Sequence, residues 1–392
     1  MTGAAPRVAT FDGVRGVAIL LVMLLHLTVV DTSTAVGQLL TRLTAGGATG
    51  VDLFFVLSGA LITGVLLDSK GAPGWLRSFY VRRTLRIWPL YYVFLVVAFY
   101  VLPRLGWLTP ELGARINRDG QPAWPYFVFL QNFNIAQAGA FRRDATGVTW
   151  SLAIEEQFYL VWPWLVLLLS RLRPAWVLGG LLAACCVARM AALAGGMNVT
   201  SVYVLTPFRL DGLCIGSLLA LAVRGGVDRR QLVWMARAGL GVGGAVVLAI
   251  LVLRRGFSVQ EDRMVMGPGL LGVSIFFGGF VAAAWLANGS GTWFDRLLSG
   301  RVLGAFGRYS YGLYLVHSPL RAALYAQLFN PDRFPASLGG VLAGQLLFYV
   351  AATALSFAVA AASYHLLETP FLRLKDRFWA TPHAAGEVAA TS

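Results

Sequence analysis

Long apolar runs recur along almost the whole chain, and they constrain its fold more than any other feature. A helix needs about 20 apolar residues to cross roughly 30 Å of hydrocarbon. Ten windows of this kind follow one another: 14–30, 51–67, 87–102, 150–169, 175–194, 204–223, 233–253, 268–287, 309–328 and 340–366. Because 57% of the residues are hydrophobic and only 13% are charged, no sizeable soluble domain remains. The sequence therefore predicts an all-α, polytopic transmembrane helix bundle of about ten spans.

Basic residues indicate which end of the bundle faces the cytoplasm. The loop between the first two windows has only Arg42, whereas the next loop carries Lys70, Arg77, Arg82, Arg83 and Arg86. By the positive-inside rule the N-terminus is then cytoplasmic, and with ten spans the C-terminus is too. This topology accounts for the net charge of +14 without nucleic-acid binding.

The predicted bundle forms one domain, because no linker or internal repeat interrupts it. We expect an N-terminal tail at 1–10, a transmembrane domain at 11–371 and a cytoplasmic C-terminal tail at 372–392. The longer outer loop, 103–149, contains the short apolar piece 124–133, which we interpret as a re-entrant or interfacial element. The three cysteines lie inside apolar windows without a CxxC spacing, so we expect neither a disulfide nor a metal site.

Two ionisable side chains in the first window need an explanation. Arg15 and His26 are eleven residues apart, so they share one helix face, about 16 Å apart along the axis. At the depth of His26, an ionisable residue normally faces the bundle interior or a water-filled cavity. Two simpler explanations stay open: Arg15 can extend its charge to the surface, and His26 can hydrogen-bond a neighbouring helix.

Carboxylates occur at a similar depth in two other windows. Asp52 lies about one turn from the outer surface, and Glu155 and Glu156 lie in the outer half of the fourth window. Burying a carboxylate is costly unless it is paired, so we expect a glutamate to pair with His26 and raise its basicity. Because adjacent helical residues point about 100° apart, at most one glutamate can face a given site.

Further polar residues mark the ninth, sixth and fifth windows. Ser310, Tyr314 and His317 are spaced by four and three residues, which places them on one helix stripe. Such a stripe fits contacts to a substrate and hydrogen bonds between helices equally well. We interpret Arg209, Asp211 and Arg189 as candidates for intramembrane ion pairs.

Arginines gather at the inner end of the third window. Arg83 and Arg86 lie one helical turn apart, and Arg15 lies at a similar depth on another helix. Converging guanidinium groups match the geometry of phosphate groups. Anchoring under the positive-inside rule explains any single one of these arginines equally well.

Seven sequence blocks occur in an order that is typical of one family. In chain order they read FDGVRGVAILLVMLLH, GVDLFFVLSGALIT, RRTLRIWPLYY, WSLAIEEQFYLVWP, FRLDGLCIG, SYGLYLVH and ETPF, and they extend from Phe11 to Phe371. With them the chain resembles the acyltransferase-3 family of bacterial integral-membrane O-acyltransferases. Phe11 and Val14 stand where the family often has leucine, and Ala60 where it often has phenylalanine. None of these departures removes a polar group.

The resemblance implies a multi-pass enzyme of the cytoplasmic (inner) membrane that acts in cell-envelope chemistry. It would move a short acyl group, acetyl or succinyl, from cytoplasmic acyl-CoA to a hydroxyl of a carbohydrate, a glycan precursor or a glycosylated small molecule. The phosphates of CoA would then contact Arg15, Arg83 and Arg86. His26 would act as general base or transient acyl carrier, oriented by Glu155 or Glu156.

The remaining polar residues are candidates for the acceptor site. We expect contacts to the acceptor, or to the oxyanion of the transition state, from Asp52, Asp211, Ser310, Tyr314 and His317. Intramembrane ionisable residues also suit a proton-coupled transporter of an acylated or anionic substrate, although repeats and broken helices in matching positions are not evident. The sequence leaves open the acyl group, the acceptor, the side of the membrane where transfer occurs and the need for a separate acceptor-handling partner.

Overall fold

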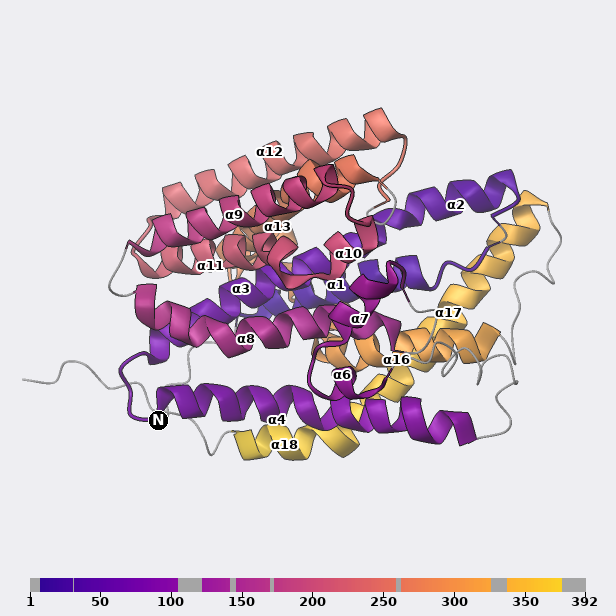
Figure 1. Ribbon diagram of the computed structural model, residues 1–392, viewed down its shortest axis with the longest axis horizontal. Helices are drawn as coiled ribbons and strands as arrows, with labels where there is room; N and C mark the ends of the chain where they lie inside the picture. The colour runs from indigo at the N-terminus through magenta and orange to yellow at the C-terminus, as the bar shows by residue number, and fades with distance from the viewer. Residues whose placement is uncertain are drawn as a thin grey trace, which may run out of the picture.

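The computed structural model describes residues 8–30, 32–104, 122–141, 146–169, 173–258, 262–325 and 337–375. These residues form helices and connecting turns, without a strand. Most of the long helices run roughly along the long axis of the molecule (Figure 1), as in an all-α polytopic membrane protein. The helices are α1 Ala9–His26, α2 Ala35–Ala45, α3 Gly50–Ser69, α4 Trp75–Val96, α6 Trp124–Phe127, α7 Gln131–Ala138, α8 Trp150–Leu169, α9 Pro174–Ala194, α10 Val199–Val204, α11 Leu210–Arg224, α12 Arg229–Arg254, α13 Leu270–Ala287, α14 Trp293–Leu298, α15 Arg301–Arg308, α16 Ser310–Ala323, α17 Leu338–Ser363 and α18 Thr369–Lys375.

Seven segments of the described chain are long and apolar enough to cross a membrane. They are Ala9–His26, Ala35–Ser69, Trp75–Val101, Pro174–Ala194, Arg229–Arg254, Val265–Ala287 and Gly339–Leu374. The three other predicted windows coincide with α8, α11 and α16. Because α11 and α16 have only 15 and 14 residues, each is at most about 22 Å long, less than the hydrocarbon thickness. The number of spans and the side of the termini therefore stay predictions.

Shorter helices appear where the apolar windows predict none. α2 begins after Thr34, whose hydroxyl accepts a hydrogen bond from the backbone of Gly37 at 3.0 Å and so caps the helix. The short apolar piece 124–133 contributes to α6 and α7, which are both too short to cross a bilayer. Residues 105–121 and 142–145 of the predicted outer loop, and 376–392 of the predicted tail, lie outside the described residues.

Glycines allow α3 and α11 to pack closely in the bundle. A Cβ atom on Gly59 would lie 2.1 Å from the carbonyl oxygen of Leu213, and one on Gly216 would lie 1.9 Å from that of Val56. Small residues of this kind let helix backbones approach each other where lipid leaves packing as the main attraction. The contact sets the start of α11 beside the start of α3, which matters for the buried charges described below.

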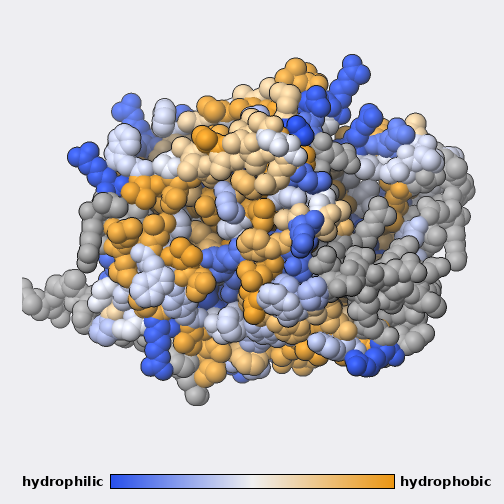
Figure 2. Space-filling view, viewed as in Figure 1, coloured by the Kyte–Doolittle hydropathy of each residue, from blue (hydrophilic) through white to orange (hydrophobic). Residues whose placement is uncertain are grey.

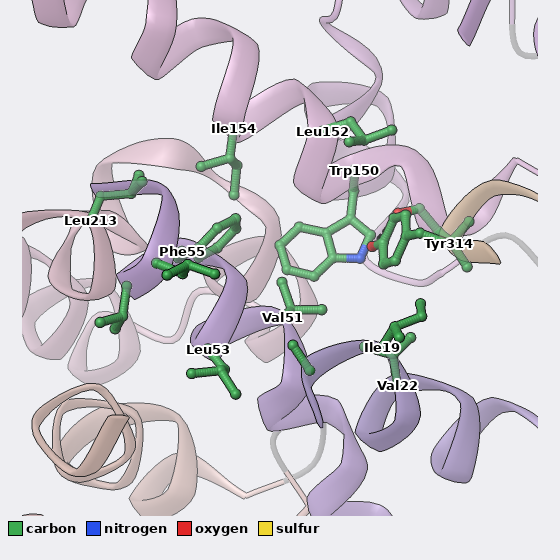
Figure 3. Packing of buried hydrophobic residues seen from close by; sticks show 14 of the residues in the cluster. Ile19, Val22, Val51, Leu53, Phe55, Trp150, Leu152, Ile154, Leu213 and Tyr314 are labelled. Atoms are coloured by element: carbon green, nitrogen blue, oxygen red, sulfur yellow. Dashed lines mark hydrogen bonds between the residues drawn. The ribbon is translucent and has the colours of Figure 1, made fainter. Parts of the chain in front are cut away.

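The outer surface and the core of the bundle differ in the expected way. Hydrophobic side chains cover much of the face seen in Figure 2, and strongly hydrophilic ones lie at both ends of the molecule and at a few places in its middle. Exposed large apolar side chains include Trp176 of α9, which is 75% exposed, as expected for a helix that faces lipid. Inside, Trp150 of α8 lies between Phe55 of α3 and Tyr314 of α16 (Figure 3). Phe55 and Tyr314 of this layer also line the cavity described below.

Candidate active site

A cavity of about 630 Å³ lies among α1, α3, α4, α8 and α16. One end is polar and includes Asp68 and Ser69, the last two residues of α3. The other end includes Val51 and Phe54, in the first turns of the same helix. Since residues 51 to 69 of a helix extend over about 27 Å, the cavity runs through most of the thickness of the bundle.

The polar half of the cavity holds what we call the arginine cluster, which consists of Arg15 from α1 and Arg82, Arg83 and Arg86 from α4. Arg15 donates a hydrogen bond of 2.8 Å to Asp12, one turn earlier on α1. Arg83 and Arg86 lie close enough to Arg15 for their charges to repel its own. The structure thus brings together the three arginines that the sequence singles out, and concentrates positive charge on one wall of the cavity.

Aromatic rings hold Arg83 in place. Its guanidinium carbon lies 5.9 Å from the centre of the Phe79 ring and 5.2 Å from that of the Tyr159 ring, distances typical of cation–π contacts. Arg82, the fourth member of the cluster, is missed by the sequence argument. Its spacing of four residues from Arg86 is a usable signal, because residues four apart share a helix face.

Glu155 reaches the middle of the cavity from α8. It accepts a hydrogen bond of 2.9 Å from the hydroxyl of Ser58 on α3, and the hydroxyl of Tyr159 lies 3.5 Å from that of Ser58. The positive charges of Arg83 and Arg86 attract the carboxylate. Glu155 therefore lies in the part of the cavity that is next to the arginine cluster. Ser58 is a second residue that the sequence argument misses.

Glu156 points to a different neighbour. It accepts a hydrogen bond of 3.0 Å from the indole nitrogen of Trp88 on α4 and does not line the cavity. Within the described residues neither glutamate contacts His26. The predicted pairing of His26 with a glutamate is therefore wrong, because the packing of α1 turns His26 toward α16 and not toward α8.

His26, the last residue of α1, contacts His317 of α16. Nδ1 of His26 lies 2.8 Å from Nε2 of His317, and the ring centres are 5.0 Å apart with the two planes 19° from parallel. His317 is fully buried, and its Nδ1 lies 2.9 Å from the carbonyl oxygen of Leu313. Because both ring nitrogens of His317 are engaged, His317 has no donor left for an oxyanion, contrary to the expectation from the sequence. Arg321, also missed, donates a hydrogen bond of 2.9 Å to the carbonyl oxygen of His26.

Tyr314 lies between the apolar end of the cavity and this histidine pair. It lines the cavity, and the centre of its ring is 5.9 Å from that of His317. Its hydroxyl donates to the carbonyl oxygen of Val148 at 2.8 Å, so the 2.6 Å contact with Ser151 requires the serine hydroxyl to donate. Ser310, one turn earlier on α16, also lines the cavity. One face of α16 thus extends from the cavity to the histidine pair.

Asp52 and Asp211 are buried in ion pairs outside the cavity. Asp52 accepts a hydrogen bond of 2.9 Å from Arg209, and Asp211 accepts one of 2.7 Å from Arg189. All four side chains are at most 1% exposed. Neither aspartate lines the cavity, so the structure separates both from the other predicted substrate contacts. Among the residues that the structure describes, no group of histidine, cysteine and acidic side chains is placed to hold a metal ion.

Comparisons with known proteins find similarity to acyltransferases. Residues 8–365 match a family model that is described as an acyltransferase domain. The chain is 30% identical to the peptidoglycan O-acetyltransferase OatA of Listeria monocytogenes over 380 residues, which cover 93% of this chain and 55% of that protein. It is 27% identical to the O-acetyltransferase OatA of Staphylococcus aureus over 400 residues, which cover 97% of this chain and 60% of that protein.

The chain thus spans between 55% and 60% of the length of these two curated relatives. No solved structure gives a significant match. The family match, however, extends over all five of the helices that surround the cavity. On this evidence the chain belongs to the acyltransferase-3 family of membrane acyltransferases.

Proposed function

We propose that this chain is a membrane O-acetyltransferase that uses acyl-CoA as donor and a carbohydrate hydroxyl as acceptor. The observation that carries the proposal is the cavity, which leads from the arginine cluster to an apolar end that includes Tyr314. Neither histidine of the pair lines the cavity, but the ring centre of His317 lies 5.9 Å from that of Tyr314. Membership of the acyltransferase-3 family supports acyl transfer. The names of the relatives, which specify O-acetyl transfer, favour acetyl over succinyl as the acyl group.

The arginine cluster suits the phosphates of the donor. A guanidinium group can form two parallel hydrogen bonds to one phosphate, and the mutual repulsion of Arg15, Arg83 and Arg86 is relieved when a polyanion binds. The pantetheine arm then follows α3 toward Val51 and Phe54, where apolar walls suit a small uncharged acyl group. In this arrangement Glu155 holds the hydroxyl of Ser58 and offsets part of the positive charge of the arginine cluster.

His26 serves as general base in the proposed reaction. Its Nδ1 contacts His317, while its Nε2 has no partner among the described residues. The acceptor hydroxyl gives its proton to Nε2 as its oxygen attacks the thioester carbonyl. When the tetrahedral intermediate collapses, the carbon–sulfur bond breaks and the CoA thiolate takes the proton from His26. General acid–base catalysis of this kind contributes about 10²- to 10⁴-fold to a rate.

The name of a relative supports the proposed class of acceptor, and the distribution of basic residues supports the proposed location. The Listeria monocytogenes relative is named for peptidoglycan, and this chain spans little more than half of it, so we propose only the wider class of carbohydrate or glycoside hydroxyls. A separate acceptor-handling partner fits this proposal. The arginine cluster faces the cytoplasm, where acyl-CoA is available, if both termini are cytoplasmic as the basic residues indicate. We accordingly propose the cytoplasmic membrane as the location.

The donor site can be tested without knowing the acceptor. Purified protein in detergent is titrated by calorimetry with acetyl-CoA, succinyl-CoA and free CoA, as wild type and as the Arg83→Ala, Arg86→Ala double variant. Each lost hydrogen bond to a charged group is worth about 1.5 to 3 kcal/mol, so the double variant is expected to bind acetyl-CoA at least about tenfold more weakly. Arg77→Ala, an exposed position on the same helix that does not line the cavity, is the matched control.

Two results would count against the proposal. Failure of the folded wild-type protein to bind any acyl-CoA would overturn it and favour a proton-coupled transporter of an anionic substrate. Equal losses in Arg77→Ala and in the double variant would show that general surface charge, and not the arginine cluster, attracts the donor. Tighter binding of succinyl-CoA than of acetyl-CoA would keep acyl transfer and correct the acyl group.

A further inference from the structure

The hydrogen bonds of the histidine pair determine where each ring carries its proton. The carbonyl oxygen of Leu313 can only accept, so the contact of 2.9 Å requires that Nδ1 of His317 donates. In neutral His317 the other nitrogen, Nε2, then carries a lone pair. Across the contact of 2.8 Å, Nδ1 of His26 must therefore donate to it. It follows that neutral His26 holds its proton on Nδ1 and leaves Nε2 bare.

We propose that His317 is a positioning residue whose ring holds His26 in the tautomer with a bare Nε2, the form that can accept a proton from the acceptor hydroxyl. This inference rests on the proposed function of His26 as general base. It assigns His317 a role other than contact with the acceptor or oxyanion. The tautomer matters because imidazole in water favours a proton on Nε2, the nitrogen that must be free here.

The partner of His26 is unusual in being neutral. A catalytic histidine is often oriented by a carboxylate, but among the described residues no carboxylate contacts either ring. The charged group that faces the pair is Arg321 of the same helix as His317, and its positive charge acts on both rings. Tyr314 is the other titratable neighbour on α16. A carboxylate at this place would also accept from Arg321, because it has two acceptor oxygens, whereas the unprotonated nitrogen of a neutral imidazole has one lone pair and accepts from His26 alone.

Hydrogen bonds to the backbone at the end of α1 hold the His26 ring at a fixed position relative to His317. Arg321 donates to the carbonyl oxygen of His26, and the side-chain amide of Gln345 on α17 donates to that of Leu27 at 2.9 Å. The backbone nitrogen of Val29 donates in turn to Gln345 at 2.8 Å. Three hydrogen bonds therefore hold the end of α1 against α16 and α17, independent of the imidazole rings.

Two substitutions separate the proposed role from simple packing. His317→Gln keeps a side-chain oxygen that can accept from Nδ1 of His26, whereas His317→Leu fills similar space without an acceptor. In the serine protease triad a wrong histidine tautomer lowers kcat by about 10⁴-fold. We expect kcat to fall by about 10² to 10⁴ in His317→Leu and by less than about tenfold in His317→Gln. The KM for acetyl-CoA is expected to stay within about twofold in both variants, because His317 does not line the donor cavity.

Nitrogen-15 NMR of ring-labelled histidine reads the tautomer directly and needs no acyl transfer. The chain has four histidines, and the signals of His26 are assigned by their loss in His26→Gln. We expect a protonated Nδ1 and a bare Nε2 in the wild type and in His317→Gln, and a proton mainly on Nε2 in His317→Leu. Thermal melting in the same detergent checks that each variant is folded.

The outcomes distinguish this inference from the proposed function. A wild-type His26 with its proton on Nε2 would overturn the inference, even if His317→Leu did not fold. Full turnover by His317→Leu, or an unchanged tautomer in it, would also overturn it. The predicted NMR pattern in a protein that binds acyl-CoA but transfers no acyl group would instead refute the function of His26 and leave the tautomer assignment in place.

Discussion

The buried pair of Asp52 and Arg209 offers the sharpest test of how much a buried ion pair between helices contributes to the free energy of unfolding. Asp52 of α3 is 1% exposed, and Arg209, the residue that immediately precedes α11, is fully buried. Their ion pair therefore joins α3 to the start of α11. The guanidinium carbon lies 4.5 Å from the centre of the Tyr203 ring and close to two further aromatic rings. Within the described residues, the second oxygen of Asp52 and two nitrogens of Arg209 make no hydrogen bond. Each charge therefore depends on the other.

The expected magnitude follows from this isolation. Removing one partner of a buried ion pair costs about 3 to 5 kcal/mol, because the other charge stays buried and unpaired. In Asp52→Ala the aromatic rings still stabilise Arg209 by about 1 kcal/mol, so we expect a loss near the lower bound, about 3 kcal/mol. Arg209→Ala also loses the ring contacts and is expected to cost about 1 kcal/mol more. In the double variant neither charge is stranded, so its loss should be smaller than the sum by about 2 kcal/mol.

Reversible unfolding in mixed detergent micelles measures the free energies of unfolding for this double-mutant cycle. Asp68→Ala is the matched control, because Asp68 lies on the same helix and pairs with Arg224 at the other end of α11. Their side chains are 46% and 27% exposed, so this pair is expected to contribute at most about 1 kcal/mol.

The reasoning would be refuted if Asp52→Ala destabilised the protein no more than Asp68→Ala does, or if the cycle showed no coupling. A direct role of Asp52 in acceptor binding predicts the reverse pattern, with stability retained and turnover lost. Donor titrations of Asp52→Ala complete the test, because acetyl-CoA affinity is expected to be unchanged in any variant that folds.

Three further predictions concern the cavity and the helix packing. Glu155→Gln keeps an acceptor for Ser58 but removes a negative charge beside the arginine cluster, so acetyl-CoA is expected to bind about fivefold more tightly, a change of about 1 kcal/mol. The same calorimetric titration of Glu156→Gln is expected to show less than a twofold change in affinity. Equal effects of the two substitutions would contradict the different surroundings of the two carboxylates. Tyr314→Phe removes the hydrogen bonds to Val148 and from Ser151 and is expected to lower the free energy of unfolding by about 1 to 3 kcal/mol, whereas an unchanged value would show that these contacts contribute nothing. Gly216→Val is expected to separate α3 from α11 and to abolish the cooperative melting transition, while Gly179→Val, with open space around it, should melt like the wild type.

Properties that depend on one helix at a time were predictable from the sequence. The windows 14–30 and 233–253 are read as spans because hydrophobicity and length are local quantities, and the helices α1 and α12 are found there. The face shared by Ser310 and Tyr314 follows from a spacing of four residues, and both side chains line the cavity. The same local logic, together with the order of the family blocks, singled out the arginines of α1 and α4.

Weakly apolar or short elements were harder to predict. α2 contains a glutamine, two threonines and an arginine among its leucines, so hydropathy does not mark it as an apolar window. Leu39 and Leu43 on this helix are 56% and 68% exposed, which shows that no buried stripe marks it either. Its helical state depends on the Thr34 cap and on its neighbours along the chain.

Contacts between helices were decided by the tertiary structure alone. The sequence by itself predicted that Glu155, Glu156 and His26 lie at a similar depth in the bundle, that a buried ionisable group needs a partner, and that Asp211, Arg209 and Arg189 belong among the candidates for ion pairs. It did not determine that His26 meets His317, that Glu155 meets Ser58, or that Asp52 meets Arg209. Such pairings depend on the rotation and depth of each helix, and these are set by close packing at positions such as Gly59 and Gly216. Because that packing sums many small van der Waals terms across the whole bundle, no single segment of the sequence contains the information that selects one partner over another.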